Sequence, residues 1–567
     1  WLYDENMPFE ALKNLDDYAS LKEEISKTLE KGQLGYFEQL VKECFLDNKN
    51  AALVCLIPQK GLAAKNEKAL ADQLASYKSF LSKEEISRIV SETKALLAFQ
   101  QKEESPEDLK KLPTLKRKDL KRRCRTLSNI PKTVAKVPVV YHETVTNGIG
   151  YVSLYFDLGD VPVDFMPELS LLTQVLGKVD TATYPYQELD SEIGMHTGTI
   201  NFGLSMYNDP ENEEGYRAYL SVRMKAIYDE MSNGFELIRD MLLTSDLDNT
   251  VRLKEILVEA RLRHQMKMQH MGHLIAAARC SAYQNSAGVF SDQTAGVGFY
   301  EGLKKSEEEM ADCPALLSDK LKLLVHMLVT RSTLLVSYTS EKEGRAAFEK
   351  ALKTFVDNIP KGRPIQKRRN FEPYGLLNEA FTTAGQVQFV AKHGEFNTKK
   401  FPFTGSLNVL RHIMNYDYLW QNIRVTGGAY GCGATFTRKG DVTMRSYRDP
   451  HLKRSVNIYK KAVDFIRNFD VDEETMTKFI IGTIGGEDTP MTPSLFDTTS
   501  MAAYMNGLTT EERQKNRDQI LDCTPEDIRA LADYVKDAWK KSGICVVGSE
   551  SAIEKDKHLF KTIRPLI

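Results

Sequence analysis

The stretch QNIRVTGGAYGCGATF, residues 421–436, decides the fold and the chemistry expected of this chain. It runs from the end of an amphipathic helix, through a pair of glycines, into a strand. Gly427 and Gly428 permit backbone angles that other residues resist, so they predict a tight turn. Tyr430 follows Arg424 by six residues across this turn. A guanidinium and a phenolic hydroxyl held this close can both donate hydrogen bonds to one oxyanion.

The pattern alone leaves two interpretations of Tyr430 open. In a strand that begins here, Tyr430 shares one face with Cys432, Ala434 and Phe436. That face is either buried, which makes Tyr430 a core tyrosine, or it leaves Tyr430 as the first side chain at a cleft mouth. The pattern favours the core. A phosphate cradle is the weaker alternative, because no Lys-Ser/Thr follows the glycines and a strand replaces the expected helix.

Around this stretch, the chain repeats one order of elements twice, at a spacing of about 230 residues. The order is strand, helix, glycine-containing turn, hairpin, helices and a final apolar strand. In the first unit the predicted strands are 137–145, 150–159, 197–207, 216–227 and 332–339, with a helix over 165–179. In the second they are 386–394, a hairpin around Lys439-Gly440 and 542–548, with a helix over 406–425. We therefore predict two homologous α+β domains, at 131–365 and 366–567.

The beginning of the chain is expected to belong to something larger. Residues 10–47 have a helical pattern, and the apolar segment 51–58 is predicted as a strand with no partner nearby in sequence. We interpret residues 1–65 as the C-terminal tail of a preceding α+β domain. The opening WLYDENMPFEAL has neither an initiator Met nor a signal-peptide pattern, so we expect a fragment or a processed product.

Residues 66–130 are predicted to form a helical hairpin linker between that tail and the two domains. Ser82 and Glu85 have the spacing of a capping box, which marks the start of the second helix. A basic run follows at 110–125. It contains no interleaved aromatic residues, so a solvated linker face is favoured over an acidic partner.

Composition excludes several function classes. The net charge of −2 argues against a nucleic-acid binder, which carries an excess of Lys and Arg. No apolar run approaches the roughly 20 residues of a membrane span, so a soluble protein without a membrane partner is expected. The eight cysteines contain no CxxC pair, which favours reduced thiols and a cytoplasmic location over a disulfide framework or a structural zinc site.

The histidines offer one weak metal-binding alternative. His264, His270 and His273 lie in one strongly helical segment, and the last two are a single turn apart. No carboxylate lies between them, so a polar helix face is favoured over a mononuclear site. The chain contains neither H-E-x-x-H nor H-x-x-E-H, and no G-x-S-x-G elbow. We therefore predict no metal site in this chain.

The segment IRVTGGAYGCGATF, together with the doubled α+β units and the helical pair before them, resembles the pitrilysin/insulinase family of zinc peptidases, the inverzincins. The most similar branch is that of the presequence proteases. The resemblance covers nearly the whole chain. It implies α/β-sandwich domains of the LuxS/processing-peptidase type, in an enzyme whose two halves close around a chamber and are joined by a helical hairpin. This chain resembles the C-terminal half.

The resemblance also implies roles for single residues. In the family, the N-terminal half binds zinc through H-x-x-E-H, and the C-terminal half contributes an Arg and a Tyr that reach the scissile carbonyl. Those positions fall on Arg424 and Tyr430, which we predict as catalytic, with Gly427 and Gly428 as substrate-binding positions. The zinc ligands would lie before this chain, whose partners would be unstructured peptides and the N-terminal half. The alternative is a non-catalytic peptide-binding or scaffold half-protein of the same superfamily.

Overall fold

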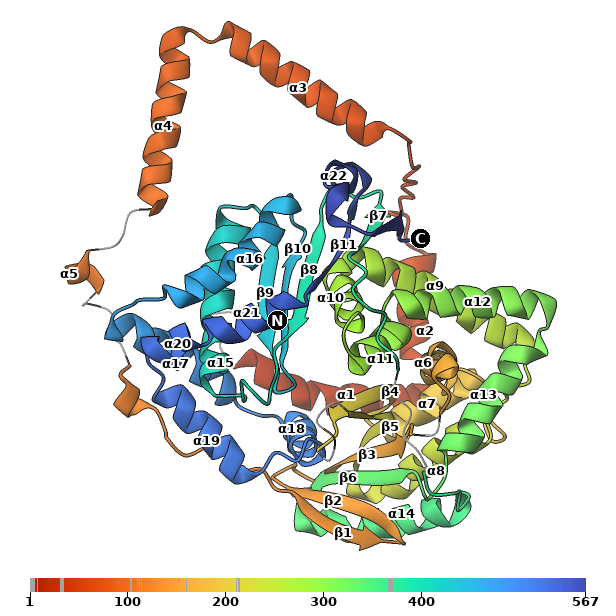
Figure 1. Cartoon of the computed structure of the whole chain (residues 1–567). Coiled ribbons are helices and arrows are strands. Elements are labelled where there is room, and N and C mark those ends of the chain that lie inside the picture. The colour runs from red at the N-terminus through yellow and green to blue at the C-terminus, as the bar shows by residue number, and fades with distance from the viewer. Residues whose placement is uncertain are drawn as a thin grey trace. The chain divides into compact units, whose positions relative to one another are not determined.

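The computed structural model describes residues 6–7, 9–30, 35–101, 105–109, 111, 113, 115–159, 161–210, 212, 215–365 and 371–567. The chain forms two units, residues 1–113 and 114–567. The first unit contains helices α1 (Glu10–Glu30), α2 (Tyr36–Val41), α3 (Leu62–Phe80), α4 (Lys83–Gln101) and α5 (Pro106–Leu109), with a π-helical turn over Lys42–Leu46 (Figure 1). The predicted helical pair is therefore confirmed.

The capping box predicted before α4 is also confirmed. The Ser82 backbone N–H donates to Glu85 Oε2 at 2.8 Å, and the Glu85 N–H donates to Ser82 Oγ at 3.1 Å. The strand predicted over 51–58 is wrong, because this segment forms neither helix nor strand. A strand needs a neighbour for its backbone groups, and the described part of this unit contains no other strand. Leu53 and Leu56 are left 91% and 95% exposed.

The second unit contains two six-stranded mixed sheets. The first has the order β1-β2-β6-β3-β5-β4. Its strands are β1 (Ile130–Val134), β2 (Val137–Glu143), β3 (Ile149–Asp157), β4 (Thr199–Asn208), β5 (Tyr216–Ile227) and β6 (Leu334–Ser340). β2 and β6 are parallel, and the other pairs are antiparallel. The five strands predicted for this sheet are confirmed, whereas β1 was not predicted.

The second sheet has the order β12-β7-β11-β8-β10-β9. Its strands are β7 (Glu379–Thr383), β8 (Phe389–Glu395), β9 (Gly431–Phe436), β10 (Asp441–Tyr447), β11 (Gly543–Ser549) and β12 (Thr562–Pro565). The run β7-β11-β8-β10-β9 matches β2-β6-β3-β5-β4 in order and in strand direction. The sequence duplication therefore corresponds to a duplicated sheet topology, and the α+β fold class is confirmed.

The helices fill the segments between the strands. The helices of the second unit that precede strand β7 in the sequence are α6 (Met166–Val175), α7 (Tyr186–His196), α8 (Met231–Leu243), α9 (Thr250–His270), α10 (Gly272–Ala282), α11 (Ser286–Ala295), α12 (Val297–Asp312), α13 (Ala315–Leu328) and α14 (Arg345–Asn358). The helices that follow strand β8 in the sequence are α15 (Ser406–Ile413), α16 (Lys453–Arg467), α17 (Glu473–Glu487), α18 (Pro493–Met505), α19 (Thr510–Leu521), α20 (Pro525–Ala530), α21 (Ala532–Lys540) and α22 (Glu550–Lys555).

Each sheet is covered on one face by a helix from the other half of this unit. Helix α10 packs on the second sheet, where Cys280 shares a buried cluster with Phe389 and Val547. Helix α18 packs on the first sheet, where Met501 shares a cluster with Tyr155. This exchange gives each sheet two buried faces. The domain boundaries predicted at 65, 130 and 365 stay predictions.

Buried polar groups hold both exchanged helices in register. On α18, the Asp497 carboxylate accepts hydrogen bonds from the Ser337 and Thr339 hydroxyls of β6, each at 2.8 Å. On α10, Arg279 donates to Glu379 of β7 through Nε at 2.5 Å and Nη2 at 3.1 Å. Arg279 also donates to Asp292 at 2.9 Å, so one guanidinium neutralises two buried carboxylates.

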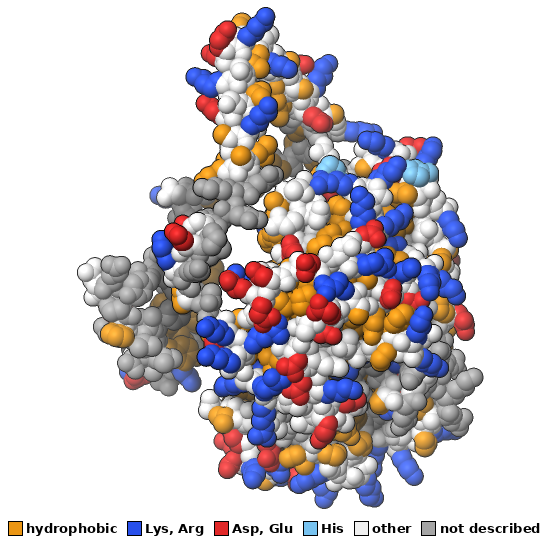
Figure 2. Space-filling view, turned by 60° about the vertical axis from the view of Figure 1, so that its left-hand side comes forward, with side chains coloured by type: hydrophobic (Ala, Val, Ile, Leu, Met, Phe, Trp, Pro, Cys, Tyr) orange, Lys and Arg blue, Asp and Glu red, His pale blue; other side chains and the backbone are white. Residues whose placement is uncertain are grey.

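The basic run at 110–125 is bound within the chain rather than forming only a solvated face. Arg122 contacts both carboxylate oxygens of Asp522, at 2.7 and 2.5 Å. Arg117 donates to the carbonyls of Leu521 and Cys523, at 3.3 and 3.1 Å. Asp522, at the end of α19, is therefore an acidic partner of this basic run within the same chain. Basic and acidic side chains both occur across the face seen in Figure 2.

Candidate functional site

The helix predicted over 406–425 forms, but its second part is π-helical. Regular α-helix ends with α15, and π-helical turns follow over Met414–Tyr418 and Trp420–Val425. The side chain of Asn415 bridges this segment to β9, donating to the Ala434 carbonyl at 3.2 Å and accepting from the Ala434 N–H at 2.5 Å. Single π-helical turns are rare and occur frequently at functional sites. Arg424 lies in the last of them.

The two glycines end this helix in an αL motif. The Gly428 N–H donates to the Arg424 carbonyl at 2.8 Å, and the Ala429 N–H donates to the Ile423 carbonyl at 3.1 Å. Gly428 has a φ of +75°, which favours glycine. At Gly427, a Cβ atom would lie 2.3 Å from the Ile423 carbonyl oxygen. Both glycines are therefore required by the turn, and their predicted contact with substrate stays a prediction.

Tyr430 is 69% exposed, so its interpretation as a core tyrosine is wrong. Its backbone N–H donates to the Tyr447 carbonyl at 3.1 Å, just before β9 begins. Ala434 and Phe436 face the core as predicted. The Tyr430 ring instead lies edge-on to Tyr447, 5.8 Å away. Because Tyr430 belongs to the turn and not to β9, its side chain does not join the buried face that Ala434 and Phe436 share.

Arg424 and Tyr430 line one open pocket of about 480 Å³. The Arg424 guanidinium stacks over the Trp420 ring, with Cζ 4.0 Å from the ring centroid. The remaining lining residues are Val425, Gly428, Ala429 and Arg448, so the pocket contains no carboxylate. Within the described residues, neither the Arg424 nor the Tyr430 side chain makes a hydrogen bond or an ion pair. Both side chains therefore keep their donors available for an anionic or carbonyl oxygen.

Two residues of this pocket were not predicted. Trp420 supplies the aromatic platform for Arg424, and Arg448 adds a second positive charge. Arg448 has a φ of +49°, an uncommon conformation for a residue with a side chain. It follows β10 directly, and β10 pairs with β9 beside the glycine turn. In the sequence, the positive charge of Arg448 was the one feature that could have suggested a role in binding an anion. Its position at the pocket depends on the pairing of β9 with β10.

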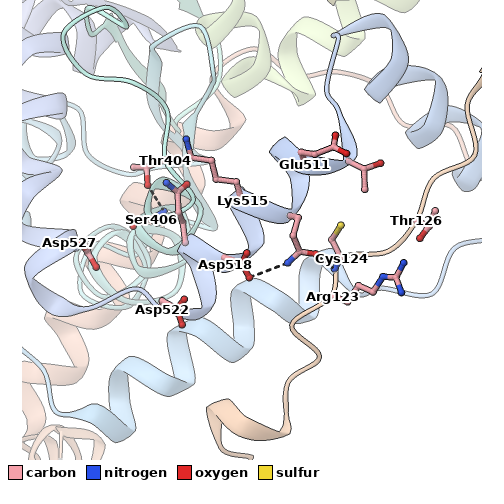
Figure 3. A pocket seen from close by; sticks show the side chains of 13 residues that line it. Arg123, Cys124, Thr126, Thr404, Ser406, Glu511, Lys515, Asp518, Asp522 and Asp527 are labelled. Carbon is pink, nitrogen blue, oxygen red and sulfur yellow. Dashed lines mark hydrogen bonds between the residues drawn. The ribbon is translucent and has the colours of Figure 1, made fainter.

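A larger cavity lies elsewhere in this unit. It has a volume of about 840 Å³ and lies beside α19, with Cys124, Thr404 and Asp518 among its lining residues (Figure 3). Gln514 donates to Asp518 at 3.1 Å there. None of the site residues predicted from the sequence lines this cavity.

The three histidines of the helical segment do not lie on one continuous helix. His264 and His270 belong to α9, whereas His273 belongs to α10. His264 is buried with Nε2 2.8 Å from the Gly296 carbonyl, and the His273 ring lies 4.8 Å from that of Tyr447. Burial lowers the pKa of His264 from 6.5 to about 4, although the bond to Gly296 opposes this shift. His264 is thus a buried, neutral structural histidine.

This burial predicts a loss of stability in mild acid. Because the pKa is lower in the folded state, stability is complete above pH 6.5 and is lost as the pH falls towards 4. Between pH 6.5 and 5 we expect wild type to lose about 2 kcal/mol more free energy of unfolding than His264→Gln. Urea unfolding of both proteins at several pH values measures this difference. Equal losses would show that His264 is not responsible.

Comparisons with known proteins show which family has similar sequences. Residues 56–305 match the peptidase M16 (subfamily C) associated family, and residues 378–550 match the PreP C-terminal domain. The chain is 31% identical to Protein HypA of Clostridium perfringens over 100% of its own length and 57% of that protein. It is 29% identical to presequence protease 1, chloroplastic/mitochondrial, of Arabidopsis thaliana, over 96% of this chain and 50% of that protein. The chain therefore spans about half the length of these curated relatives.

Solved structures agree on the fold. The peptidase M16 inactive domain from Pseudomonas fluorescens aligns with a TM-score of 0.56 at 12% identity, covering 75% of this chain and 98% of that one. The first half of the periplasmic protease PqqL from Escherichia coli aligns with a TM-score of 0.52 at 10% identity, covering 76% and 93%.

The family matches, together with the duplicated sheets, define the class, a half-molecule of an M16-type peptidase. The chain belongs to the M16 peptidase family and corresponds to the C-terminal half of a presequence-protease-like member.

Proposed function

We propose that this chain is the C-terminal half of a zinc-dependent endopeptidase that degrades unstructured peptides inside a closed chamber. The observation that carries the proposal is the pair Arg424 and Tyr430, which line one open pocket with unengaged donors. Two such donors suit the negative charge that develops on a scissile carbonyl oxygen during hydrolysis. Relatives named presequence protease support a peptide substrate.

In this mechanism the chain's own residues bind and orient the substrate carbonyl. Stacking on Trp420 restricts the Arg424 guanidinium, so less side-chain freedom is lost when it binds the oxyanion. Tyr430 donates a hydrogen bond from its phenolic hydroxyl to the same oxygen. Arg448 adds positive charge at the pocket. Chamber closure would exclude water, which strengthens these hydrogen bonds.

The zinc would be bound by the N-terminal half, because this chain does not provide its ligands. Helix α6, which follows β3 of the first sheet, contains no histidine and is largely buried. When bound, zinc supplies Lewis-acid polarisation of the carbonyl and an activated water. The residues of this chain therefore contact the substrate or stabilise the transition state. We expect the chain alone to hydrolyse no peptide. We also propose a cytoplasmic location, supported by eight free cysteines.

Complementation tests this function. The chain is mixed with a separately produced N-terminal half and zinc, and cleavage of a fluorogenic peptide is followed. We expect no hydrolysis by either half alone and saturable hydrolysis by the mixture, lost on addition of a chelator. A folded, associated pair that leaves the peptide intact would contradict the proposal.

A non-catalytic peptide-binding or scaffold half-protein is the second candidate. It is favoured by the structural similarity to a domain named as inactive. The upstream reading frame separates the two candidates, because an H-x-x-E-H in a preceding half supports the enzyme. Its absence supports the binding protein, for which peptide affinity measured by fluorescence anisotropy would be the relevant activity.

A further inference from the structure

Three potential metal ligands converge on the face of the second sheet that α10 covers. His393 and Glu395 are two residues apart on β8, so their side chains project from the same face. The register places Asp441 of β10 directly opposite Glu395. His393 Nε2 lies 3.8 Å from Glu395 Oε1 and 3.6 Å from Asp441 Oδ1. The three ligand atoms all lie within 4.8 Å of one another.

The histidine is buried and aimed into this cluster without a partner. Its side chain is 2% exposed, and Nε2 is buried with no hydrogen bond among the described residues. Its other ring nitrogen, Nδ1, lies 2.8 Å from Thr443 Oγ1, and the register places Thr443 opposite His393. If Nδ1–H donates to this hydroxyl, Nε2 presents its lone pair to the carboxylates. This is the arrangement that orients a metal-binding imidazole.

The two carboxylates are held in place by neighbouring side chains. Asn285 Nδ2 donates to Glu395 Oε1 at 2.6 Å and to Asp441 Oδ1 at 3.0 Å. Thr437 Oγ1 donates to the other oxygen of Asp441 at 2.5 Å. Asn285 is itself fixed, because its side-chain oxygen caps α11 by accepting from the Gly288 N–H at 2.6 Å. The side chains of Glu395 and Asp441 remain 33% and 22% exposed, so an ion can reach them.

We propose that His393, Glu395 and Asp441 bind a divalent transition-metal ion of the zinc type. His393 Nε2 lies 3.8 Å from the Glu395 oxygen and 3.6 Å from the Asp441 oxygen, so the imidazole and either carboxylate can both lie about 2.0–2.2 Å from one ion, as zinc requires of nitrogen and carboxylate ligands. An imidazole with two carboxylates suits zinc, cobalt or manganese better than calcium. Three protein ligands leave one position for water. The ion would join β8 to β10 next to Asn285, where α11 begins.

This site is distinct from the proposed peptidase zinc and from His270 and His273. The proposal departs from the sequence prediction that the chain binds no metal, which stays a prediction. The pattern K-H-G-E at 392–395 is too short to be diagnostic, and Asp441 joins it only through the pairing of β8 with β10. The charge balance also favours a cation, because the hydrogen bonds from Asn285 and Thr437 are neutral and leave two adjacent carboxylates.

Metal titration of the chelator-treated chain tests the site. Isothermal titration with zinc is expected to show one equivalent of saturable binding, and cobalt is expected to give visible absorption bands of a low-coordinate ion. Asp441→Asn and Glu395→Gln should each weaken binding at least about tenfold. Thr443→Val preserves the shape of the residue and removes only the partner of Nδ1, and we expect about 10–100-fold weaker binding.

Two matched controls separate this site from surface binding. Glu474→Gln removes an exposed carboxylate from α17, and His270→Gln removes the exposed histidine at the end of α9; both should bind zinc as wild type does. Circular dichroism of the metal-free variants confirms the fold. Absence of saturable binding, or binding that Asp441→Asn and Thr443→Val leave unchanged, would overturn the proposal. So would loss of binding in His270→Gln.

Discussion

Replacing Arg424 by alanine is expected to lower the kcat of the reconstituted peptidase by about 10²–10³-fold, the usual effect of removing one oxyanion donor. The structure gives the reason, because this guanidinium stacks on Trp420 at the pocket and has no other hydrogen-bond or ion-pair partner within the described residues. The change removes an interaction made in the transition state, so KM should change little. Steady-state kinetics with a fluorogenic peptide measure both constants.

Controls show whether the loss belongs to the site. Arg411→Ala and Tyr416→Phe change exposed residues of the same helical segment, and both should retain wild-type rates. Arg424→Lys keeps the charge but loses the planar fork, so its rate should fall between those of wild type and Arg424→Ala. A rate for Arg424→Ala equal to that for Arg411→Ala would remove Arg424 from the mechanism.

Replacing Arg279 by methionine is expected to lower the free energy of unfolding of the chain by about 3–5 kcal/mol. Arg279 is 7% exposed and is the shared cation of Glu379 and Asp292, which are 3% and 0% exposed. Its removal takes the cation from the buried Asp292 and leaves Glu379 with the longer contact to Arg564, at 3.7 Å. Because Arg279 lies on α10 and Glu379 on β7, the change also loosens the helix that covers the second sheet.

Chemical denaturation monitored by circular dichroism measures this loss. Arg263→Met is the matched control, since Arg263 lies on α9 with a 54% exposed side chain and one surface ion pair. Surface pairs contribute about 0–1 kcal/mol, so the control should unfold nearly as wild type does. If Arg279→Met were no less stable than Arg263→Met, the buried network would not stabilise the exchanged helix.

Much of the fold was predictable because the central strands carry their own signals. Segment 150–159 combines β-branched and aromatic residues, and segment 542–548 is rich in β-branched residues; both have lengths suited to buried strands. The strands β1, β7 and β12 were not predicted. Each is only four or five residues long, which is too short to carry a clear hydrophobic pattern. The apolar segment 51–58 gave the opposite error. Its composition favours a strand, but pairing requires a partner that the described part of its unit lacks.

In the candidate site too, residues that are close in sequence could be predicted, whereas residues brought together by strand pairing could not. Arg424, Tyr430 and the glycine turn are local in sequence, and the resemblance identified them before the structure located them. The exposure of Tyr430 depends on the glycine turn before it, which alternation along a strand does not include. Arg448, the Asp497 contacts and the cluster around His393 depend on register and on helix exchange between the halves. No local pattern contains that information.

The initial rate of fluorogenic-peptide cleavage by the zinc-loaded N-terminal half, mixed with either wild-type chain or Tyr430→Phe chain, tests the central claim most directly. Sedimentation confirms that both chains associate equally with that half. We expect full activity with wild type and about 10²–10³-fold less with Tyr430→Phe, whose only change is the loss of one hydroxyl donor. Equal rates from two equally associated chains would contradict the claim that this half completes the active site.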